Sequence, residues 1–255
     1  MSTPLRHRFD GPEDAPVLVL SNSLGTSLAM WDGMAPALAE RFRVLRYDQR
    51  GHGATPAVPG PYAIEDLGRD ALGLLDELGL ERVSFAGCSL GGMTGMWLAI
   101  EAPERIDRLA LFNTSAHMPP RETWTERAAT VRARGMGAVV DAALERWLSP
   151  AAPRESVAAT RAMLLATDAE GYAGCCEAIA RHDLRDRIGA IEAPALIVAA
   201  TDDPSTPPDH AQVLAAGIGG SRLVVLDGLR HLACVERPDD VSRELLAHLT
   251  SEVKA

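Results

Sequence analysis

The sequence predicts an α/β fold in which a mostly parallel central sheet is flanked by helices and carries an inserted helical cap. Three observations lead to this prediction. Short apolar runs alternate with helical patterns, which favours a parallel sheet with helices on both sides. Several runs are continuous, such as Val17-Leu18-Val19-Leu20, as expected of strands covered on both faces. Residues 118–188 interrupt the alternation, because they contain no convincing strand.

Most of the predicted strands are short apolar runs between turn residues. The strands are expected at residues 5–9, 16–21, 42–47, 83–87, 107–112, 194–200 and 221–226. The helices outside the interruption are expected at residues 31–40, 64–79, 90–101, 207–216 and 238–250. Pro103 ends the third helix and Pro238 begins the last one, because proline cannot continue a helix but fits its first turn.

The interruption is predicted to be a folded helical unit. It begins at Met118-Pro119-Pro120 and continues through arginine-rich helical segments to Arg187-Ile188. Apolar spacing such as Ala162 and Leu165, together with aromatic residues, argues against a disordered excursion. We therefore expect a core made of residues 1–117 and 189–255, and a helical cap made of residues 118–188.

Charge and composition exclude several classes of function. The chain carries 25 Lys and Arg against 35 Asp and Glu, which gives a net charge of −10. An acidic protein is a poor partner for nucleic acids and for anionic membranes, so we expect neither. Because Lys254 is the single lysine, Schiff-base chemistry and lysine-dependent phosphate loops are also excluded.

The sequence predicts a cytoplasmic protein without a metal site. No apolar run follows the N-terminal residues, as a signal peptide requires, and the apolar stretch 195–200 is too short to cross a bilayer. The cysteines form no C-x-x-C pair, and no histidine or cysteine cluster has metal-ligand spacing. We therefore expect reduced cysteines and no bound metal.

The stretch Gly87-Cys88-Ser89-Leu90-Gly91 lies between a predicted strand and a predicted helix. This strand–G-x-S-x-G–helix pattern is typical of a nucleophile elbow, in which a serine stands at the tip of a sharp, strained turn. The turn requires small neighbours, which Gly87 and Gly91 provide. The helix that begins at Leu90 directs its free N–H groups toward the position where an oxyanion forms. Ser89 is therefore the predicted nucleophile.

Serine is a poor nucleophile at its ordinary pKa and needs a base. In this topology an acid follows a late strand and a histidine follows the last strand. His231 follows the strand expected at 221–226, and Asp202 and Asp203 both follow the strand expected at 194–200. We therefore expect His231 to be the base, and Asp202 or Asp203 to orient it.

The oxyanion hole is predicted from two backbone N–H groups. One belongs to Leu90, directly after the nucleophile. The other is expected in the loop Ser21 to Thr26, where Leu24 is our choice. Removal of one such donor typically raises the reaction barrier by about 3 kcal/mol.

These residues resemble the α/β-hydrolase superfamily and, more narrowly, the 3-oxoadipate enol-lactonases of the protocatechuate branch of aromatic catabolism. Two features are more specific to the lactonases, namely the cap segment Gly171 to Ile188 and Asn22-Ser23, where most of the superfamily has His-Gly. On the family's pattern the acid is Asp203, directly before Pro204. The matching stretches are LSNSLGTSLAMWD, YDQRGHGAT, FAGCSLGGMTGMWLA, GYAGCCEAIARHDLRDRI, DDPSTPP and HLACVERPDDV.

The resemblance implies an α/β-hydrolase fold and a serine hydrolase that opens 3-oxoadipate enol-lactone to 3-oxoadipate without a cofactor. Its partner is then a small lactone that carries a carboxylate, and we expect a cationic contact for this group in the cap. Since lysine is absent there, Arg132, Arg134 and Arg161 are the candidates, and we favour Arg134. Trp124 and Trp147 are expected to form apolar walls of the site. The sequence predicts no particular oligomeric state.

Two other readings of the sequence remain open. A carboxylesterase, a carbon–carbon bond hydrolase or a cofactor-free perhydrolase on the same fold would use the same triad, and only the cap would distinguish them. A ligand-binding protein that kept the fold and lost the chemistry is the second alternative. The presence of Ser89, Asp203 and His231 in the required order argues against that alternative.

Overall fold

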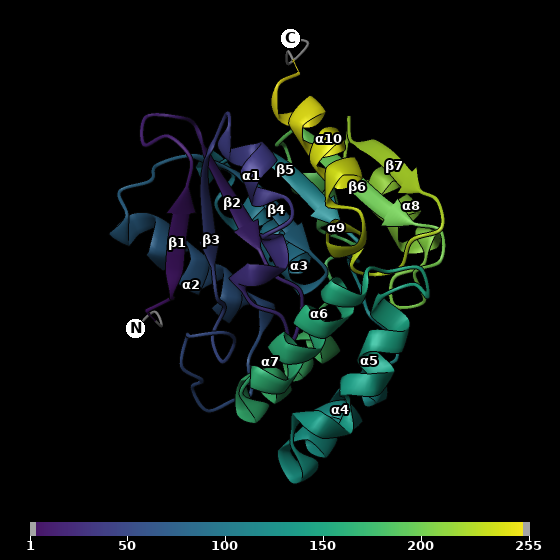
Figure 1. The fold of residues 1–255 in the computed structure, drawn as a ribbon. Helices are drawn as coiled ribbons and strands as arrows, with labels where there is room; N and C mark the ends of the chain where they lie inside the picture. The colour runs from purple at the N-terminus through teal and green to yellow at the C-terminus, as the bar shows by residue number, and fades with distance from the viewer. Residues whose placement is uncertain (1–3, 252–255) are drawn as a thin grey trace.

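A computed structural model describes residues 4–251 of the protein (Figure 1). In these residues the central sheet has seven strands in the order β1-β3-β2-β4-β5-β6-β7. Neighbouring strands are parallel except for β1 and β3, which pair antiparallel at one edge. All the predicted strands are present, with ends within two residues of the prediction. They are β1 His7–Asp10, β2 Val17–Ser21, β3 Arg43–Tyr47, β4 Val83–Cys88, β5 Ile106–Phe112, β6 Ala195–Ala200 and β7 Arg222–Leu226.

Helices cover both faces of the sheet, as predicted. On one side α1 contacts α10, and on the other side α2 packs with α3 (Figure 1). Helix α8 packs against β6 and β7. The bounds are α1 Ala35–Ala39, α2 Ile64–Glu77, α3 Leu90–Glu101, α8 Pro208–Gly217, α9 Ala233–Glu236 and α10 Pro238–Leu249, with a 3-10 turn η2 Pro103–Arg105.

The single helix predicted over residues 31–40 is wrong. The chain instead forms a 3-10 helix, η1 Leu28–Trp31, followed by a break and then the short helix α1. Ser27 caps η1 by accepting a hydrogen bond from the Ala29 N–H at 3.4 Å. Pro36 lies in the first turn of α1, where its missing N–H costs nothing, so it begins a new helix rather than continuing the old one.

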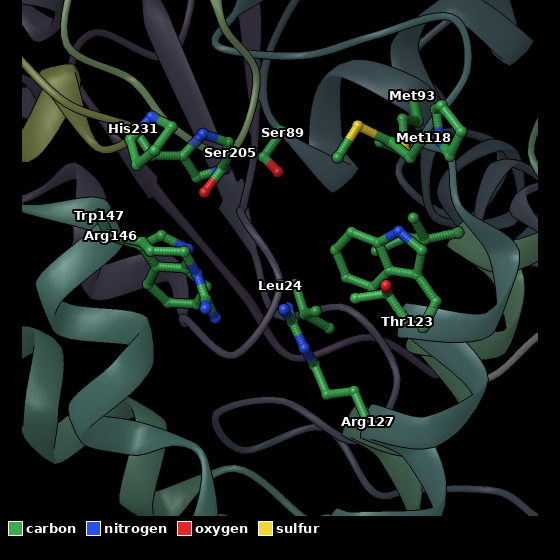
Figure 2. A pocket seen from close by; sticks show the side chains of 14 residues that line it. Leu24, Ser89, Met93, Met118, Thr123, Arg127, Arg146, Trp147, Ser205 and His231 are labelled. Carbon is green, nitrogen blue, oxygen red and sulfur yellow. The ribbon is translucent and has the colours of Figure 1, made fainter.

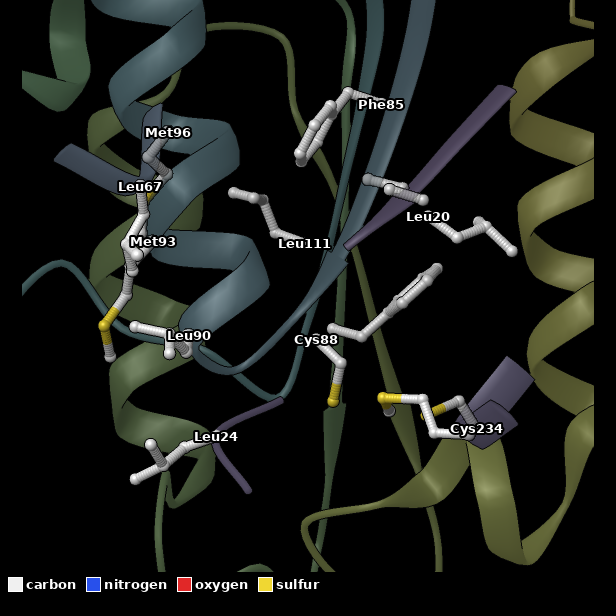
Figure 3. Packing of buried hydrophobic residues seen from close by; sticks show 14 of the residues in the cluster. Leu20, Leu24, Leu67, Phe85, Cys88, Leu90, Met93, Met96, Leu111 and Cys234 are labelled. Carbon is white, nitrogen blue, oxygen red and sulfur yellow. The ribbon is translucent and has the colours of Figure 1, made fainter. Parts of the chain in front are cut away.

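The sheet and α3 share one buried apolar cluster. Phe85 of β4 and Leu111 of β5 belong to it together with Met93 and Met96 of α3 (Figure 3). Every residue of β4 and β6 is buried, which explains why both strands read as continuous apolar runs in the sequence. This packing fixes β4 and α3, the two elements on either side of Ser89.

Between β5 and β6 the described chain forms helices gathered at one end of the sheet (Figure 1). Helix α4 packs against α7, and an isolated β-bridge joins His117 to Asp183 where the segment leaves and rejoins the core. No helix within residues 4–251 is long and apolar enough to cross a membrane. The bounds are α4 Arg121–Arg134, η3 Met136–Ala138, α5 Val140–Trp147, α6 Arg154–Ala166, α7 Ala169–Arg181 and η4 Ile188–Ala190.

The parallel strands place the predicted functional residues at one edge of the sheet. Parallel strands share a direction, so the loops that follow their carboxyl ends lie side by side. The loop after β2 contains Leu24, and β4 leads directly into Ser89. Asp203 follows β6 and His231 follows β7.

Candidate active site

Ser89 stands at a sharp turn between β4 and α3. Its backbone has φ 53° and ψ −112°, a region that serine seldom adopts. A Cβ on Gly87 would lie 2.2 Å from the Gly91 carbonyl oxygen, and a Cβ on Gly91 would lie 2.1 Å from the Ser21 carbonyl oxygen. The Thr114 hydroxyl donates a hydrogen bond to the Ser89 carbonyl at 2.7 Å. The glycines of the motif are therefore required by close contact with backbone.

The imidazole of His231 is hydrogen-bonded to Asp203. His231 Nδ1 lies 2.8 Å from Asp203 Oδ2, and Asp203 is only 2% exposed. Asp202, the other acid considered from the sequence, is exposed to solvent. The structure thus brings Asp203, and not Asp202, against the imidazole.

Other donors also surround the Asp203 carboxylate. Thr206 Oγ1 and Asn113 Nδ2 donate to Oδ2 at 2.6 and 3.0 Å, and the N–H groups of Ser205 and Thr206 donate to Oδ1 at 2.8 and 3.1 Å. Burial raises the pKa of Asp203, but the charge and hydrogen bond of His231 and the donors of Thr206 outweigh it and hold the pKa below its ordinary value. Asp203 is therefore a carboxylate at neutral pH, which fixes a proton on His231 Nδ1 and leaves Nε2 free to act as a base.

Ser89 and His231 line the same cavity, which has a volume of about 230 Å³ (Figure 2). No hydrogen bond joins the Ser89 hydroxyl to His231 within the described chain. Such contacts are often long in the absence of substrate and tighten when it binds. The cavity is lined by Leu24, Ser89, Met93, Met118, Pro119, Thr123, Trp124, Arg127, Arg146, Trp147, Ile179, Pro204, Ser205 and His231.

In the loop after β2, the N–H groups that flank Leu24 are hydrogen-bonded. The N–H of Ser23 donates to the Met30 sulfur at 3.3 Å, and the N–H of Gly25 donates to His52 Nε2 at 2.9 Å. The N–H of Thr26 also has a partner, in the Ser23 carbonyl at 3.2 Å. Among the described residues this leaves the N–H of Leu24 without an acceptor. The N–H of Leu90 is similarly free, because it belongs to the first residue of α3.

Side chains hold this loop in place. Asn22 Nδ2 donates to the Tyr47 carbonyl at 2.7 Å, and Asn22 Oδ1 accepts from Trp31 Nε1 at 2.8 Å. Burial lowers the pKa of His52 to about 4, so its ring is neutral and Nε2 accepts the Gly25 N–H. No motif in the sequence places His52 at the site, because its contact with the loop depends on the packing of distant segments.

The cap residues predicted from the sequence divide into two groups. Trp124 and Trp147 line the cavity, and the Trp147 ring centroid lies 6.2 Å from that of His231. Arg134 is exposed and does not line the cavity, so its predicted role is not supported. It lies seven residues beyond Arg127 on α4, which corresponds to about 10 Å along the helix axis.

The other predicted arginines form surface ion pairs. Arg132 pairs with Glu170 at 2.7 Å and with Glu177 at 2.5 Å, and Arg161 pairs with Asp141 at 2.7 Å. Neither arginine lines the cavity that contains Ser89.

Two arginines that sequence analysis missed line the cavity instead. The side chains of Arg127 and Arg146 extend into it from α4 and α5 (Figure 2). The Arg127 guanidinium lies 4.5 Å from the centre of the Trp124 ring, and burial, assisted by the charge of Arg127, lowers the pKa of Arg146. Within residues 4–251 neither forms an ion pair with a carboxylate. The sequence contained an indication of both arginines, because Arg127 is three residues from Trp124 and Arg146 adjoins Trp147, the two predicted wall residues.

Comparisons with known proteins agree with the fold. Residues 16–161, more than half of the chain, match the family model described as the alpha/beta hydrolase fold. The chain belongs to the α/β-hydrolase family. Residues 168–251 of this α/β-hydrolase also match a model described as a TAP-like protein.

Relatives of this α/β-hydrolase include enol-lactonases. It is 39% identical over 237 residues to 3-oxoadipate enol-lactonase 2 of Acinetobacter baylyi, which covers 92% of this chain and 88% of the relative. The crystal structure of the enol-lactonase from Burkholderia xenovorans LB400 is 43% identical, with a TM-score of 0.95 over 98% of this chain and 97% of that one. A hydrolase from Pseudomonas aeruginosa PA01 is 46% identical, with a TM-score of 0.93 over 97% and 94%.

Proposed function

We propose that the protein is a serine hydrolase that opens 3-oxoadipate enol-lactone to 3-oxoadipate. The observation that carries this proposal is a pair of arginines, Arg127 and Arg146, that face Ser89 and His231 across one cavity without a carboxylate partner. Two such cations in an enclosed site favour an anionic ligand. A small lactone that carries a carboxylate fits this charge, and the names of two relatives, both 3-oxoadipate enol-lactonases, point to the same substrate.

The reaction begins with proton transfer from Ser89 to His231. The Ser89 hydroxyl oxygen attacks the lactone carbonyl while His231 Nε2 accepts its proton, and Asp203 stabilises the resulting imidazolium. The N–H groups of Leu24 and Leu90 donate to the oxyanion of the tetrahedral intermediate. These donors are backbone groups held by packing, so little reorganisation accompanies the change in charge.

Collapse of the intermediate breaks the bond between the carbonyl carbon and the ring oxygen. The leaving group is an enolate, which is a better leaving group than a simple alkoxide. It takes the proton held on His231 Nε2 and becomes a ketone, and the imidazole is again neutral. The substrate is then held to Ser89 as an acyl-enzyme. Water, deprotonated by His231, attacks the ester and releases 3-oxoadipate together with the free serine.

The arginine pair supplies a direct test. We expect Arg127→Gln and Arg146→Gln each to raise KM for the enol-lactone by about 10- to 100-fold, because a hydrogen bond to a charged group contributes about 1.5–3 kcal/mol. Turnover of the neutral ester p-nitrophenyl acetate should change little. Arg134→Gln is the matched control, because Arg134 lies on α4 like Arg127 but is exposed and outside the cavity. A larger rise in KM for Arg134→Gln than for the other two variants would contradict this assignment.

Two measurements separate the proposal from its alternatives. A carboxylesterase would turn over p-nitrophenyl acetate faster than the enol-lactone, so the ratio of the two kcat/KM values decides between them. The second measurement is covalent labelling of Ser89 by an active-site phosphonate, a reaction that requires an activated serine. The absence of labelling would favour a ligand-binding protein that lacks the chemistry.

A further inference from the structure

Glu236 is a buried carboxylate outside the triad. It ends helix α9, and it is 6% exposed. Its Oε1 accepts the N–H of Arg230 at 3.0 Å, and its Oε2 accepts the N–H of Ser149 at 2.9 Å. Within the described chain it forms no ion pair. Backbone N–H groups alone compensate this charge, although burial of a carboxylate is costly.

The two N–H groups belong to segments that carry the active site. Arg230 directly precedes His231, and Ser149 follows the cap residues Arg146 and Trp147 by two or three positions. Both oxygens of one carboxylate thus join the histidine loop of the core to the end of α5 in the cap. Residues of both segments line the cavity, namely His231 from the core loop and Arg146 and Trp147 from α5.

Other contacts run along the same junction. The N–H of Leu232 donates to the Trp147 carbonyl at 3.0 Å, and the Arg230 guanidinium donates to the Glu145 and Leu148 carbonyls. The rings of Trp147 and His231 face one another at 6.2 Å between centroids. The position of the base and the position of the cap wall are therefore set by one continuous network.

We propose that Glu236 is a positioning residue that sets the His231 base and the Arg146–Trp147 wall together. The charged carboxylate strengthens both hydrogen bonds and offers an acceptor to each segment. A glutamine would offer an oxygen to one N–H and would direct its own N–H₂ group toward the other. The inference rests on the proposed function, since it assigns His231 and Arg146 to catalysis and to substrate binding.

Glu236→Gln tests the proposal when two substrates are compared. We expect kcat to fall about tenfold or more for both the enol-lactone and p-nitrophenyl acetate, because a small displacement of a base has effects of this size. KM should rise for the enol-lactone alone, because only that substrate contacts Arg146. Asp48→Asn is the matched control, since buried Asp48 also accepts two backbone N–H groups, from Leu28 at 2.7 Å and Ala54 at 2.9 Å.

The control separates positioning from stability. Asp48→Asn is expected to lower Tm as Glu236→Gln does, while kcat and KM stay within about twofold of wild type. If Glu236→Gln lowers Tm but leaves both kinetic constants unchanged, Glu236 is merely structural and the inference is wrong. If the wild-type protein hydrolyses neither substrate, the proposed function fails instead.

Ser149→Pro keeps the proposal testable if Glu236→Gln does not fold. Proline removes the N–H by which Ser149 binds Glu236 and leaves the Arg230 N–H in place. Leu148 before it has φ −124° and ψ 136°, which suits a residue before proline. We expect a raised KM for the enol-lactone and an unchanged kcat for p-nitrophenyl acetate. An unchanged KM for the enol-lactone would overturn the proposed link between Glu236 and the cap.

Discussion

The strained backbone of Ser89 is imposed by its surroundings and does not depend on its hydroxyl group. A non-glycine residue at positive φ costs about 1–3 kcal/mol and persists only where the surrounding structure imposes it. Here β4 and α3 impose it, and the close contact of Gly91 with the backbone of Ser21 leaves no room for a relaxed turn. Alanine would meet the same constraint as serine, so only the hydroxyl is lost on substitution.

We therefore expect Ser89→Ala to fold normally and to lose nearly all turnover, by about 10⁴-fold or more. Steady-state kinetics with the enol-lactone and a thermal unfolding curve measure the two effects. Ser84→Ala, also buried in β4 but outside the cavity, is a matched control for the loss of a hydroxyl. A Ser89→Ala protein with near-native turnover would refute the assignment of the nucleophile.

The adjacent aspartates give a second prediction. Asp203→Asn should lower kcat by about 10⁴-fold, because an amide in contact with His231 Nδ1 favours the wrong tautomer. Asp202→Asn should stay within about twofold of wild type, since Asp202 is exposed. Parallel kinetics of the two variants provide the measurement, and the reverse ranking would transfer the role to Asp202.

Single residues also show where sequence reasoning succeeds and where it stops. Motif and strand order led to Ser89 and His231, because strand direction alone determines where such residues lie. Strand order alone did not distinguish Asp202 from Asp203 as the acid, because the two differ in burial, which the sequence does not show. Arg134 was favoured among Arg132, Arg134 and Arg161, and Arg127 was not considered, because a sequence shows residue type but not which arginine of a helix reaches a cavity.

The contact between α7 and the core depends on two glycines. A Cβ on Gly171 would lie 2.4 Å from the Gly51 Cα, and a Cβ on Gly51 would lie 2.3 Å from the Gly171 Cα. The start of α7 thus rests directly on a core turn, backbone against backbone. The turn is also bonded to the cap, because the Asp168 N–H donates to the Gly51 carbonyl at 3.1 Å.

Gly171→Ala should push α7 away from the core. We expect a loss of about 1–3 kcal/mol in the free energy of unfolding, the usual cost of overpacking, and a rise in KM as the cap walls shift. Urea denaturation and kinetics measure these effects. Gly137→Ala is the control, because a Cβ there meets no atom within 4 Å. Equal stability of the two variants would show that the close contact tolerates a methyl group.

Strands were easier to locate than helices for a physical reason. The central strands β4 and β6 are buried on both faces, so each is a compact apolar run that ends at a turn. The antiparallel direction of β1 carries no such signal, because strand patterns do not encode orientation. The helix predicted over 31–40 was wrong because the chain turns at Asp32 to Met34, between the end of η1 and the start of α1.

The fold brings together residues that are far apart in the chain. Ser89, Asp203 and His231 follow three different strands, and the cavity is completed by α4 and α5 from the cap. Under the proposed function, the loops at the strand ends supply the reacting groups, and the helices between β5 and β6 supply the arginines and tryptophans that select a substrate. Sequence motifs describe the first set well, because the core geometry is common to the family. The second set requires the packing of the cap to be known.

Buried histidines predict how the stability of the whole protein responds to acid. Burial lowers the pKa of His52, His182 and His248 to about 4 in each case. In the unfolded chain these groups titrate near pH 6.5. Between these values the unfolded state binds protons that the folded state does not, so stability is complete above about pH 6.5 and falls as the pH drops toward 4.

His182→Gln tests this origin of the acid sensitivity. His182 Nε2 lies 3.0 Å from the Ser115 carbonyl, and a glutamine N–H₂ group can donate there without titrating. We expect the free energy of unfolding, measured by urea denaturation at several pH values, to depend less steeply on pH between about 6 and 4.5. The reduction should approach one proton, or about 1.4 kcal/mol per pH unit. An unchanged slope would mean that His182 takes up its proton in the folded state as readily as in the unfolded chain.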